Sequence, residues 1–136
     1  MAEQRELACT ISSFGYKFGP QLDADWVIDT RMLRNPFWEP QLRRLTGRDE
    51  PVRDFVLGQP EAERLLRWVE EVLRWSGPLY AERGRPEVHV AFGCTGGRHR
   101  SVVIADALAA RIHGDGMTAR VHHRDVDKPD PRDAED

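Results

Sequence analysis

The segment best suited to chemistry is a glycine-rich loop in the C-terminal half of the chain. It reads Gly93-Cys94-Thr95-Gly96-Gly97-Arg98-His99-Arg100-Ser101 and lies between a predicted strand and a predicted helix. Such a loop aims several unpaired backbone N–H groups at one point, where the helix dipole adds roughly half a positive charge. Glycine lets the backbone fold closely around a ligand because it has no Cβ atom. The loop therefore predicts an anion site, and phosphate is the best-matched anion.

The side chains of this loop also suit a phosphate. The hydroxyl groups of Thr95 and Ser101 can donate hydrogen bonds, and the guanidinium groups of Arg98 and Arg100 can add charge-assisted ones. The alternative is that the glycines only form a tight turn and the arginines are solvated. Two known phosphate loops do not fit, because no Lys-Ser or Lys-Thr follows the last glycine and Gly-x-Gly-x-x-Gly is absent.

A second interpretation of the same loop is enzymatic. Its pattern C-x-x-G-x-x-R-S resembles the active-site loop of the cysteine-dependent protein phosphatases, in which a thiolate attacks phosphorus and an arginine holds the phosphate oxygens. The residues that fit this pattern are Cys94, Gly97, Arg100 and Ser101. Two departures count against it: Gly93 replaces the usual histidine, and no Asp lies between Asp54 and Asp106 to protonate the leaving oxygen. A phosphatase using Cys94 and Arg100 is therefore the alternative function.

Periodicity predicts the elements that position the loop. Alternating or β-rich stretches predict strands over residues 7–14, 26–28, 88–92 and 118–124, and apolar residues at helical spacing predict helices from Pro60 to Gly77-Pro78 and over residues 102–113. Residues 31–53 are rich in Pro and Gly and predict a long loop. Strand, glycine loop, helix and strand form a βαβ unit. We therefore expect a single α/β domain with a mixed, partly parallel sheet.

Length and charge limit the classes of protein. The chain has 136 residues and a mass of 15.6 kDa, which suits one domain. We expect an N-terminal extension (residues 1–6), the domain (residues 7–125) and an acidic, disordered tail (residues 126–136). The charged N-terminus leads into no signal-type apolar core and no apolar run could span a membrane, so we expect a cytoplasmic protein. Two cysteines cannot form a disulfide framework.

Four segments, read in order, carry a more extensive resemblance. They are residues 13–17, 29–36, 45–49 and 93–101. Together they resemble the C-terminal domain of RapZ, the bacterial RNase adapter, and the resemblance runs over residues 7–128. Full-length relatives carry an N-terminal nucleotide-binding domain that is missing here, so the chain resembles a stand-alone version. The resemblance implies an α/β domain that binds glucosamine-6-phosphate and, in some members, a small RNA.

The resemblance also implies a set of ligand-binding residues. By position the phosphate lies on the glycine loop, while strand-end residues and a segment near the end of the domain complement its charge. The expected ligand-binding residues are Lys17, Arg31, Asn35, Cys94, Thr95, Gly96, Gly97, Arg98, His99, Arg100, Ser101, His123 and Arg124. Phe18 and Phe37 stand where some relatives have histidine, which makes the rim of the site apolar.

Partners follow from charge and from the resemblance. The net charge is −3 and the tail is acidic, whereas the RNA-binding members end in a basic cluster, so RNA binding is possible but disfavoured. The arginines at 43, 44 and 48 form either a separate basic patch or a solvated loop. The resemblance implies a protein partner and self-association into a homo-oligomer. Trp68 is interpreted as a core residue or an oligomer contact.

We therefore expect a regulatory sensor or adapter that binds a phosphorylated metabolite, either a sugar phosphate such as glucosamine-6-phosphate or a nucleotide, and does not turn it over. No cofactor is expected. No metal site is expected either, because no pair of histidines has the i, i+4 spacing of a zinc motif.

Overall fold

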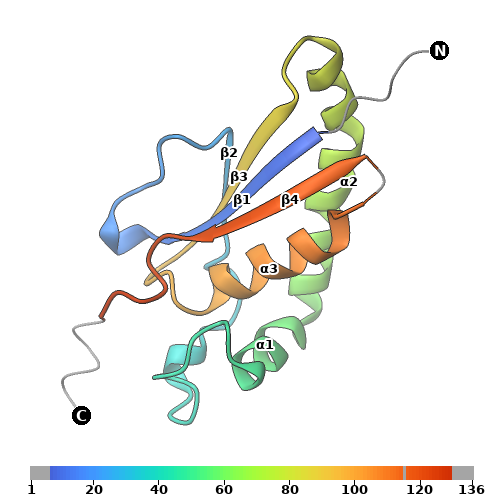
Figure 1. The fold of residues 1–136 in the computed structure, drawn as a ribbon. Coiled ribbons are helices and arrows are strands. Elements are labelled where there is room, and N and C mark those ends of the chain that lie inside the picture. Colours follow the sequence, from blue (N-terminus) through green and yellow to red (C-terminus); the bar gives the residue numbers. More distant parts are fainter. Residues whose placement is uncertain (1–6, 115, 130–136) are drawn as a thin grey trace.

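A parallel four-stranded sheet forms the framework of the domain (Figure 1). The structure is a computed structural model and describes residues 7–114 and 116–129. The strands are β1 (Leu7–Gly15), β2 (Trp26–Asp29), β3 (Glu87–Cys94) and β4 (Met117–His123), in the order β2-β3-β1-β4. All three pairings between these strands are parallel. The expected α/β class is confirmed, and the carboxyl ends of the four strands meet at one edge of the sheet.

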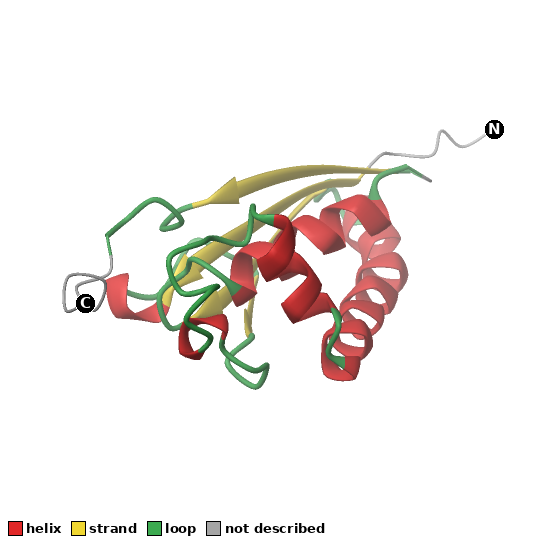
Figure 2. Ribbon diagram, turned by 90° about the horizontal axis from the view of Figure 1, so that it is seen from below, coloured by secondary structure: helices red, strands yellow, loops and turns green. Residues whose placement is uncertain are grey.

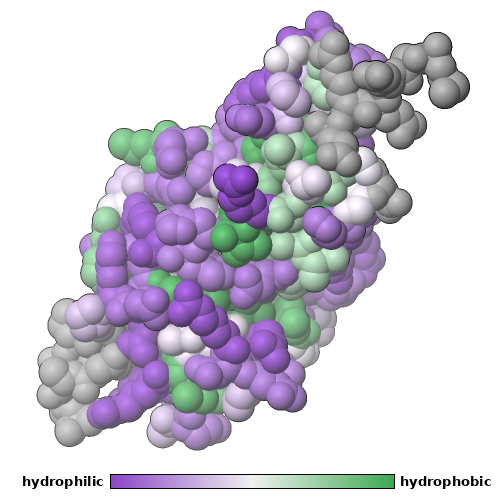
Figure 3. Space-filling model, viewed as in Figure 1, coloured by the Kyte–Doolittle hydropathy of each residue, from purple (hydrophilic) through white to green (hydrophobic). Residues whose placement is uncertain are grey.

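The helices lie on one face of this sheet (Figure 2). They are α1 (Glu50–Leu57), α2 (Pro60–Glu82) and α3 (Arg100–Ile112), with short 3-10 turns at Tyr16–Phe18 and Pro36–Trp38. Alternate strand residues such as Ile11, Val90 and Phe92 are fully buried beneath Leu66 and Leu108 and their neighbours from the helices. Hydrophilic residues cover most of the molecule as seen in Figure 3, with scattered hydrophobic ones between them.

Helix α2 is longer than its sequence predicts. The expected end at Gly77-Pro78 is wrong, because the helix continues through both residues to Glu82. Gly77 is buried against Leu7, and a Cβ atom there would lie 2.5 Å from Leu7 Cδ2, so the glycine serves close packing of the helix on β1. Pro78 is exposed, and tertiary packing outweighs its local tendency to break a helix.

The predicted long loop is wrong at its C-terminal end. Helix α1 begins at Glu50, inside the segment 31–53, and Pro51 lies in its first turn. Proline is compatible with the first helical turn because the N–H groups there have no intrahelical partner. A residue interpreted as a helix breaker is therefore part of a helix start.

The segment after β4 packs onto the domain. Val126 is buried, and Lys128 forms an ion pair with the buried carboxylate of Asp125, with Nζ 2.6 Å from Oδ1. The expected disorder from residue 126 onward therefore does not hold for these first residues, and residues 130–136 lie outside the described part of the chain. In the described residues, no helix is both long and apolar enough to cross a membrane.

Candidate functional site

The glycine loop lies where the carboxyl end of β3 passes into α3. Gly15, the last residue of β1, pairs with Cys94, the last residue of β3, so the loops that follow both strands lie side by side. This approach is very close: a Cβ atom on Gly97 would lie 2.5 Å from the backbone nitrogen of Gly15. Gly97 also has a φ of 73°, which favours glycine. The shape of the loop thus depends on glycine in both strand-end segments.

Several backbone N–H groups of the loop are not used by the protein's own loop, turn or cap hydrogen bonds. Within the described residues, no loop, turn or cap hydrogen bond uses the backbone N–H of Gly96, Gly97, His99 or Ser101. His99 is the N-cap of α3, and its side chain does not cap the helix. The start of this 13-residue helix therefore presents unsatisfied donors and the positive end of the helix dipole.

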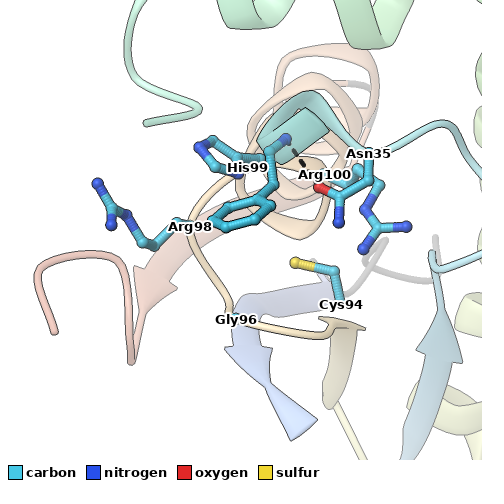
Figure 4. A pocket seen from close by; sticks show the side chains of 7 residues that line it. Asn35, Cys94, Gly96, Arg98, His99 and Arg100 are labelled. Carbon is cyan, nitrogen blue, oxygen red and sulfur yellow. Dashed lines mark hydrogen bonds between the residues drawn. The ribbon is translucent and has the colours of Figure 1, made fainter. Parts of the chain in front are cut away.

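A narrow pocket of about 10 Å³ opens beside these groups (Figure 4). Its volume corresponds to about one water molecule. Its lining residues are Asn35, Phe37, Cys94, Gly96, Arg98, His99 and Arg100. Six of these belong to the expected ligand-binding set, and the seventh, Phe37, is the residue expected to make the rim apolar. Segments 57 or more residues apart in the sequence thus meet at one pocket.

Asn35 and Arg100 are held in place by the loop after β2. The Oδ1 atom of Asn35 accepts a hydrogen bond from the backbone N–H of Phe37 at 3.1 Å, which turns the amide NH₂ group toward the pocket (Figure 4). Arg100 is buried, and its Nη1 donates to the backbone oxygens of Arg31 at 3.1 Å and Leu33 at 3.0 Å. The guanidinium group is therefore oriented by backbone acceptors.

Cys94 lies at the base of the pocket, with its sulfur directed toward the space between the other lining residues (Figure 4). Its Sγ is 3.1 Å from the hydroxyl of Ser101, which is fully buried. No carboxylate is among the residues that line the described pocket. The thiol and the arginine of the phosphatase pattern thus line the pocket, whereas none of its lining residues carries an acid that could protonate a leaving group.

A second segment supports the loop from the outside. The backbone N–H of Gly47 donates to the backbone oxygen of Arg98 at 2.7 Å, and Arg98 Nη2 donates to the backbone oxygen of Arg44 at 3.0 Å. His99 Nε2 lies 2.7 Å from the backbone oxygen of Leu45. Burial lowers the pKa of His99, so the imidazole is neutral near pH 7 and its Nε2–H is the donor. The spacing of residues in the sequence did not predict these contacts to Arg98 and His99. The one feature that could have indicated them is Gly47, which lies within the segment 45–49 of the family resemblance.

Lys17 and Arg31 do not line the pocket. The backbone N–H of Lys17 donates to the backbone oxygen of Thr95 at 3.2 Å, which joins the two strand-end loops. Arg31 forms an ion pair with Asp29 at 2.7 Å, and its guanidinium lies 4.0 Å from the ring centroid of Tyr16. The hydrogen bonds from Arg31 lower the pKa of Asp29. The charge of Arg31 is thus largely compensated by its own neighbour.

His123 and Arg124 lie on the far side of β1 from the pocket lining. His123 Nδ1 is 2.6 Å from the hydroxyl of Ser13, and its Nε2 is 2.9 Å from Asp106 Oδ1. Arg124 forms an ion pair with Asp125 at 2.8 Å and donates to the backbone oxygen of Gly19 at 2.7 Å. Both side chains thus connect elements of the protein, and neither belongs to the pocket lining.

Asp125 is a supporting residue that the expected ligand-binding set did not include. Its side chain is fully buried, accepts a hydrogen bond from the backbone N–H of Gly15 at 2.7 Å, and would be 3.0 Å from a Cβ atom on Gly97. It therefore braces the junction of the two strand-end loops. Among the described residues, no group of three or more His, Cys, Asp or Glu side chains could hold a metal ion.

Known protein families include one that matches this sequence over most of its length. The model of the RapZ C-terminal domain matches residues 7–127, nearly the whole described chain. The chain belongs to this family. The glycine loop and the strand ends around it are therefore features of a RapZ C-terminal domain.

Curated relatives of this RapZ C-terminal domain are longer proteins. A protein of Heliobacterium modesticaldum is 46% identical over 127 residues, which cover 93% of this chain and 42% of the relative. A protein of Thermobifida fusca is 47% identical over 125 residues, covering 92% of this chain and 42% of the relative. A protein of Bifidobacterium adolescentis is 48% identical over 118 residues, which cover 87% of this chain and 38% of the relative. All three are named nucleotide-binding proteins. The chain thus spans about two fifths of their length.

Proposed function

We propose that this domain binds the phosphate group of a small metabolite in the glycine loop and acts as a regulatory sensor or adapter. The observation that carries this proposal is the set of unused N–H groups of Gly96, Gly97, His99 and Ser101 at the start of α3, beside the arginines at 98 and 100. Oriented N–H groups and guanidinium groups at a helix N-terminus match the charge and the several acceptor oxygens of a phosphate.

The ligand is a sugar phosphate such as glucosamine-6-phosphate or a nucleotide. Family membership supports the first, and the names of the longer relatives support the second. The amide of Asn35 offers donors toward the pocket, and the ring of Phe37 offers an apolar surface. Because the pocket admits only about one water molecule, we expect Phe37 or Arg98 to move when the rest of the ligand enters.

Calorimetric titration tests the proposal. Wild-type protein is titrated with inorganic phosphate, glucosamine-6-phosphate, unphosphorylated glucosamine and a nucleoside diphosphate. We expect binding of at least one phosphorylated compound and none of glucosamine. Arg100→Ala should weaken that binding by about 1.5–3 kcal/mol, the value of a hydrogen bond to a charged group. Binding of glucosamine as tight as that of its phosphate, or unchanged affinity in a folded Arg100→Ala variant, would contradict the proposal.

The contact between Cys94 and Ser101 favours one further candidate, a cysteine-dependent phosphatase. In that reaction the thiolate of Cys94 would attack phosphorus, the alkoxide or phenoxide would leave, and water would release inorganic phosphate. An aryl phosphate is the suitable substrate because its leaving group needs no general acid. Turnover of an aryl phosphate that disappears in Cys94→Ser supports this candidate, and binding without turnover supports the sensor.

A further inference from the structure

The turn Pro36–Trp38 brings two aromatic rings to the edge of the phosphate pocket. Phe37 is buried and lines the pocket, whereas Trp38, the next residue, is 68% exposed and lies outside the lining. The two ring centroids are 4.9 Å apart and the ring planes form an angle of 87°, which is an edge-to-face contact. Trp38 therefore lies about one ring width beyond the lining of the pocket.

Hydrogen bonds fix the backbone of this turn. The N–H of Trp38 donates to the backbone oxygen of Asn35 at 3.2 Å, and the N–H of Phe37 donates to Asn35 Oδ1 at 3.1 Å. Arg43 Nε donates to the backbone oxygen of Phe37 at 3.0 Å. Trp38 is thus anchored beside the pocket through its backbone, although most of the residue is exposed.

An exposed tryptophan beside an anion site suits a ligand that carries a flat aromatic group. Nucleobases stack on aromatic side chains, since every base has a π-face. In a nucleotide the ribose separates the base from the phosphate, so the base can lie on Trp38 while the phosphate occupies the glycine loop. The base then stays outside the pocket, which has room for about one water molecule.

The charges around the pocket favour such a ligand over an amino sugar. The ammonium group of glucosamine-6-phosphate is best matched by a carboxylate, and none of the residues that line the described pocket carries one. Asp29, at the end of β2, forms an ion pair with Arg31. The lining offers the guanidinium groups of Arg98 and Arg100 and the ring of Phe37 instead, which suit a phosphate joined to an aromatic group.

We propose that Trp38 is a base-stacking residue of this site and that the site prefers a purine nucleoside 5′-phosphate over a sugar phosphate. A purine has a larger ring surface than a pyrimidine and so covers more of the exposed indole. The inference rests on the proposed phosphate site, and it adds a residue that determines which phosphorylated compound binds there.

Calorimetric titration with two matched ligands tests the preference. Adenosine 5′-monophosphate and ribose 5-phosphate share the sugar and the phosphate, and only the first carries a base. We expect wild-type protein to bind adenosine 5′-monophosphate about tenfold more tightly or better, within the range for stacking one base. Equal affinities overturn this inference and leave the proposed phosphate site standing. Binding of no phosphate ester at all overturns both.

Variants test the role of Trp38. Trp38→Ala should abolish the preference for adenosine 5′-monophosphate over ribose 5-phosphate, and Trp38→Phe should restore most of it, because phenylalanine keeps a π-face. Trp75→Ala is the matched control, since Trp75 is 70% exposed but lies on α2, outside the pocket lining. Circular dichroism checks that the variants fold. A preference that survives in Trp38→Ala, or that disappears equally in Trp75→Ala, overturns the inference.

Tryptophan fluorescence gives an independent measurement. Stacking of the base should quench the emission of Trp38, so adenosine 5′-monophosphate should quench the wild-type protein more strongly than it quenches Trp38→Phe. Quenching of equal size in the two proteins overturns the stacking on Trp38.

Discussion

At the scale of single residues, Asp125 shows how a buried carboxylate supports the site without lining it. Burial by itself raises the pKa of this group, but hydrogen bonds from Arg124, the backbone N–H of Gly15 and Lys128 outweigh burial, and the pKa is lowered. The ionised form is therefore favoured in the folded protein. Its contribution to stability is present above the pKa of the unfolded chain and is lost as the pH falls through the folded pKa.

This sign gives a pH-dependent prediction. At pH 7 we expect Asp125→Asn to lower the free energy of unfolding by about 3 kcal/mol, because cationic and N–H donors lose their buried partner. The difference from wild type should begin to narrow below about pH 4, where this carboxyl becomes protonated in the unfolded chain, and should be lost as the pH falls through the lower pKa of the folded protein. Asp127→Asn is the control, since Asp127 is 80% exposed and its ion pair with Arg48 lies at the surface. Urea unfolding at several pH values measures this, and a difference that stays constant down to about pH 2 would contradict it.

At the scale of elements, the decisive feature is the turn that joins β3 to α3. Its course is set by a backbone contact with the end of β1, where Gly97 and Gly15 leave no room for a Cβ atom on either side. The support from residues 44–47 and the brace at Asp125 fix the same turn from two other directions. Donors held in this way are preorganised, so binding of an anion need not order them.

Two glycines with positive φ separate the effect of packing from that of backbone strain. Gly97 and Gly19 have φ values of 73° and 95°, but only at Gly97 would an added Cβ atom meet close neighbours, whereas at Gly19 it would meet nothing within 4 Å. Gly19→Ala should cost about 1–3 kcal/mol of stability through its backbone conformation alone, since φ 95° with ψ 152° is a region that essentially only glycine adopts. Gly97→Ala should cost more and should also weaken phosphate binding, because the strand-end loops must move apart. Thermal unfolding and calorimetry measure both effects, and equal losses in the two variants would argue against the packing explanation.

At the scale of the whole molecule, charge determines which polyanions can bind. The net charge is −3, although the pocket itself contains arginines at 98 and 100. A small phosphate ligand interacts with the local donors, whereas an RNA also meets the negative charge that the sequence concentrates in residues 125–136. Selectivity for small phosphorylated ligands over RNA is therefore expected from the charge distribution.

RNA affinity as a function of salt tests this expectation. We expect binding of a structured RNA no tighter than the roughly 10⁻⁴ M typical of weak non-specific binding at physiological salt, with a shallow salt dependence. Fluorescence anisotropy of a labelled RNA, recorded from low to physiological salt concentration, measures the affinity and its salt dependence. Arg48→Glu is a suitable comparison. If the arginines at 43, 44 and 48 form a basic patch that binds RNA, this variant should bind RNA more weakly than the wild type. Tight binding whose logarithm falls steeply with the logarithm of salt concentration would contradict the expectation.

The sequence by itself determined the type of fold, the loop and the family. Alternating strands, a glycine turn and a periodic helix are local patterns, since each depends on residues close together in the chain. They predicted β1, β3, β4, α3 and the position of Cys94 and Arg100 at the junction of β3 and α3. Local patterns were wrong where a nearby signal competed with distant packing: Pro51 starts α1, and Gly77 packs against Leu7 inside α2.

Only the tertiary structure decided which residues meet at the pocket. Asn35 and Phe37 lie beside Cys94 because parallel strands gather the segments after them at one sheet edge, a relation that residue spacing does not contain. The same packing directs Arg31 to Asp29 and Arg124 to Asp125. Whether a charged side chain lines a site or pairs with a neighbour depends on contacts between distant segments. That is the physical reason why the sequence supplied the candidates and the fold selected among them.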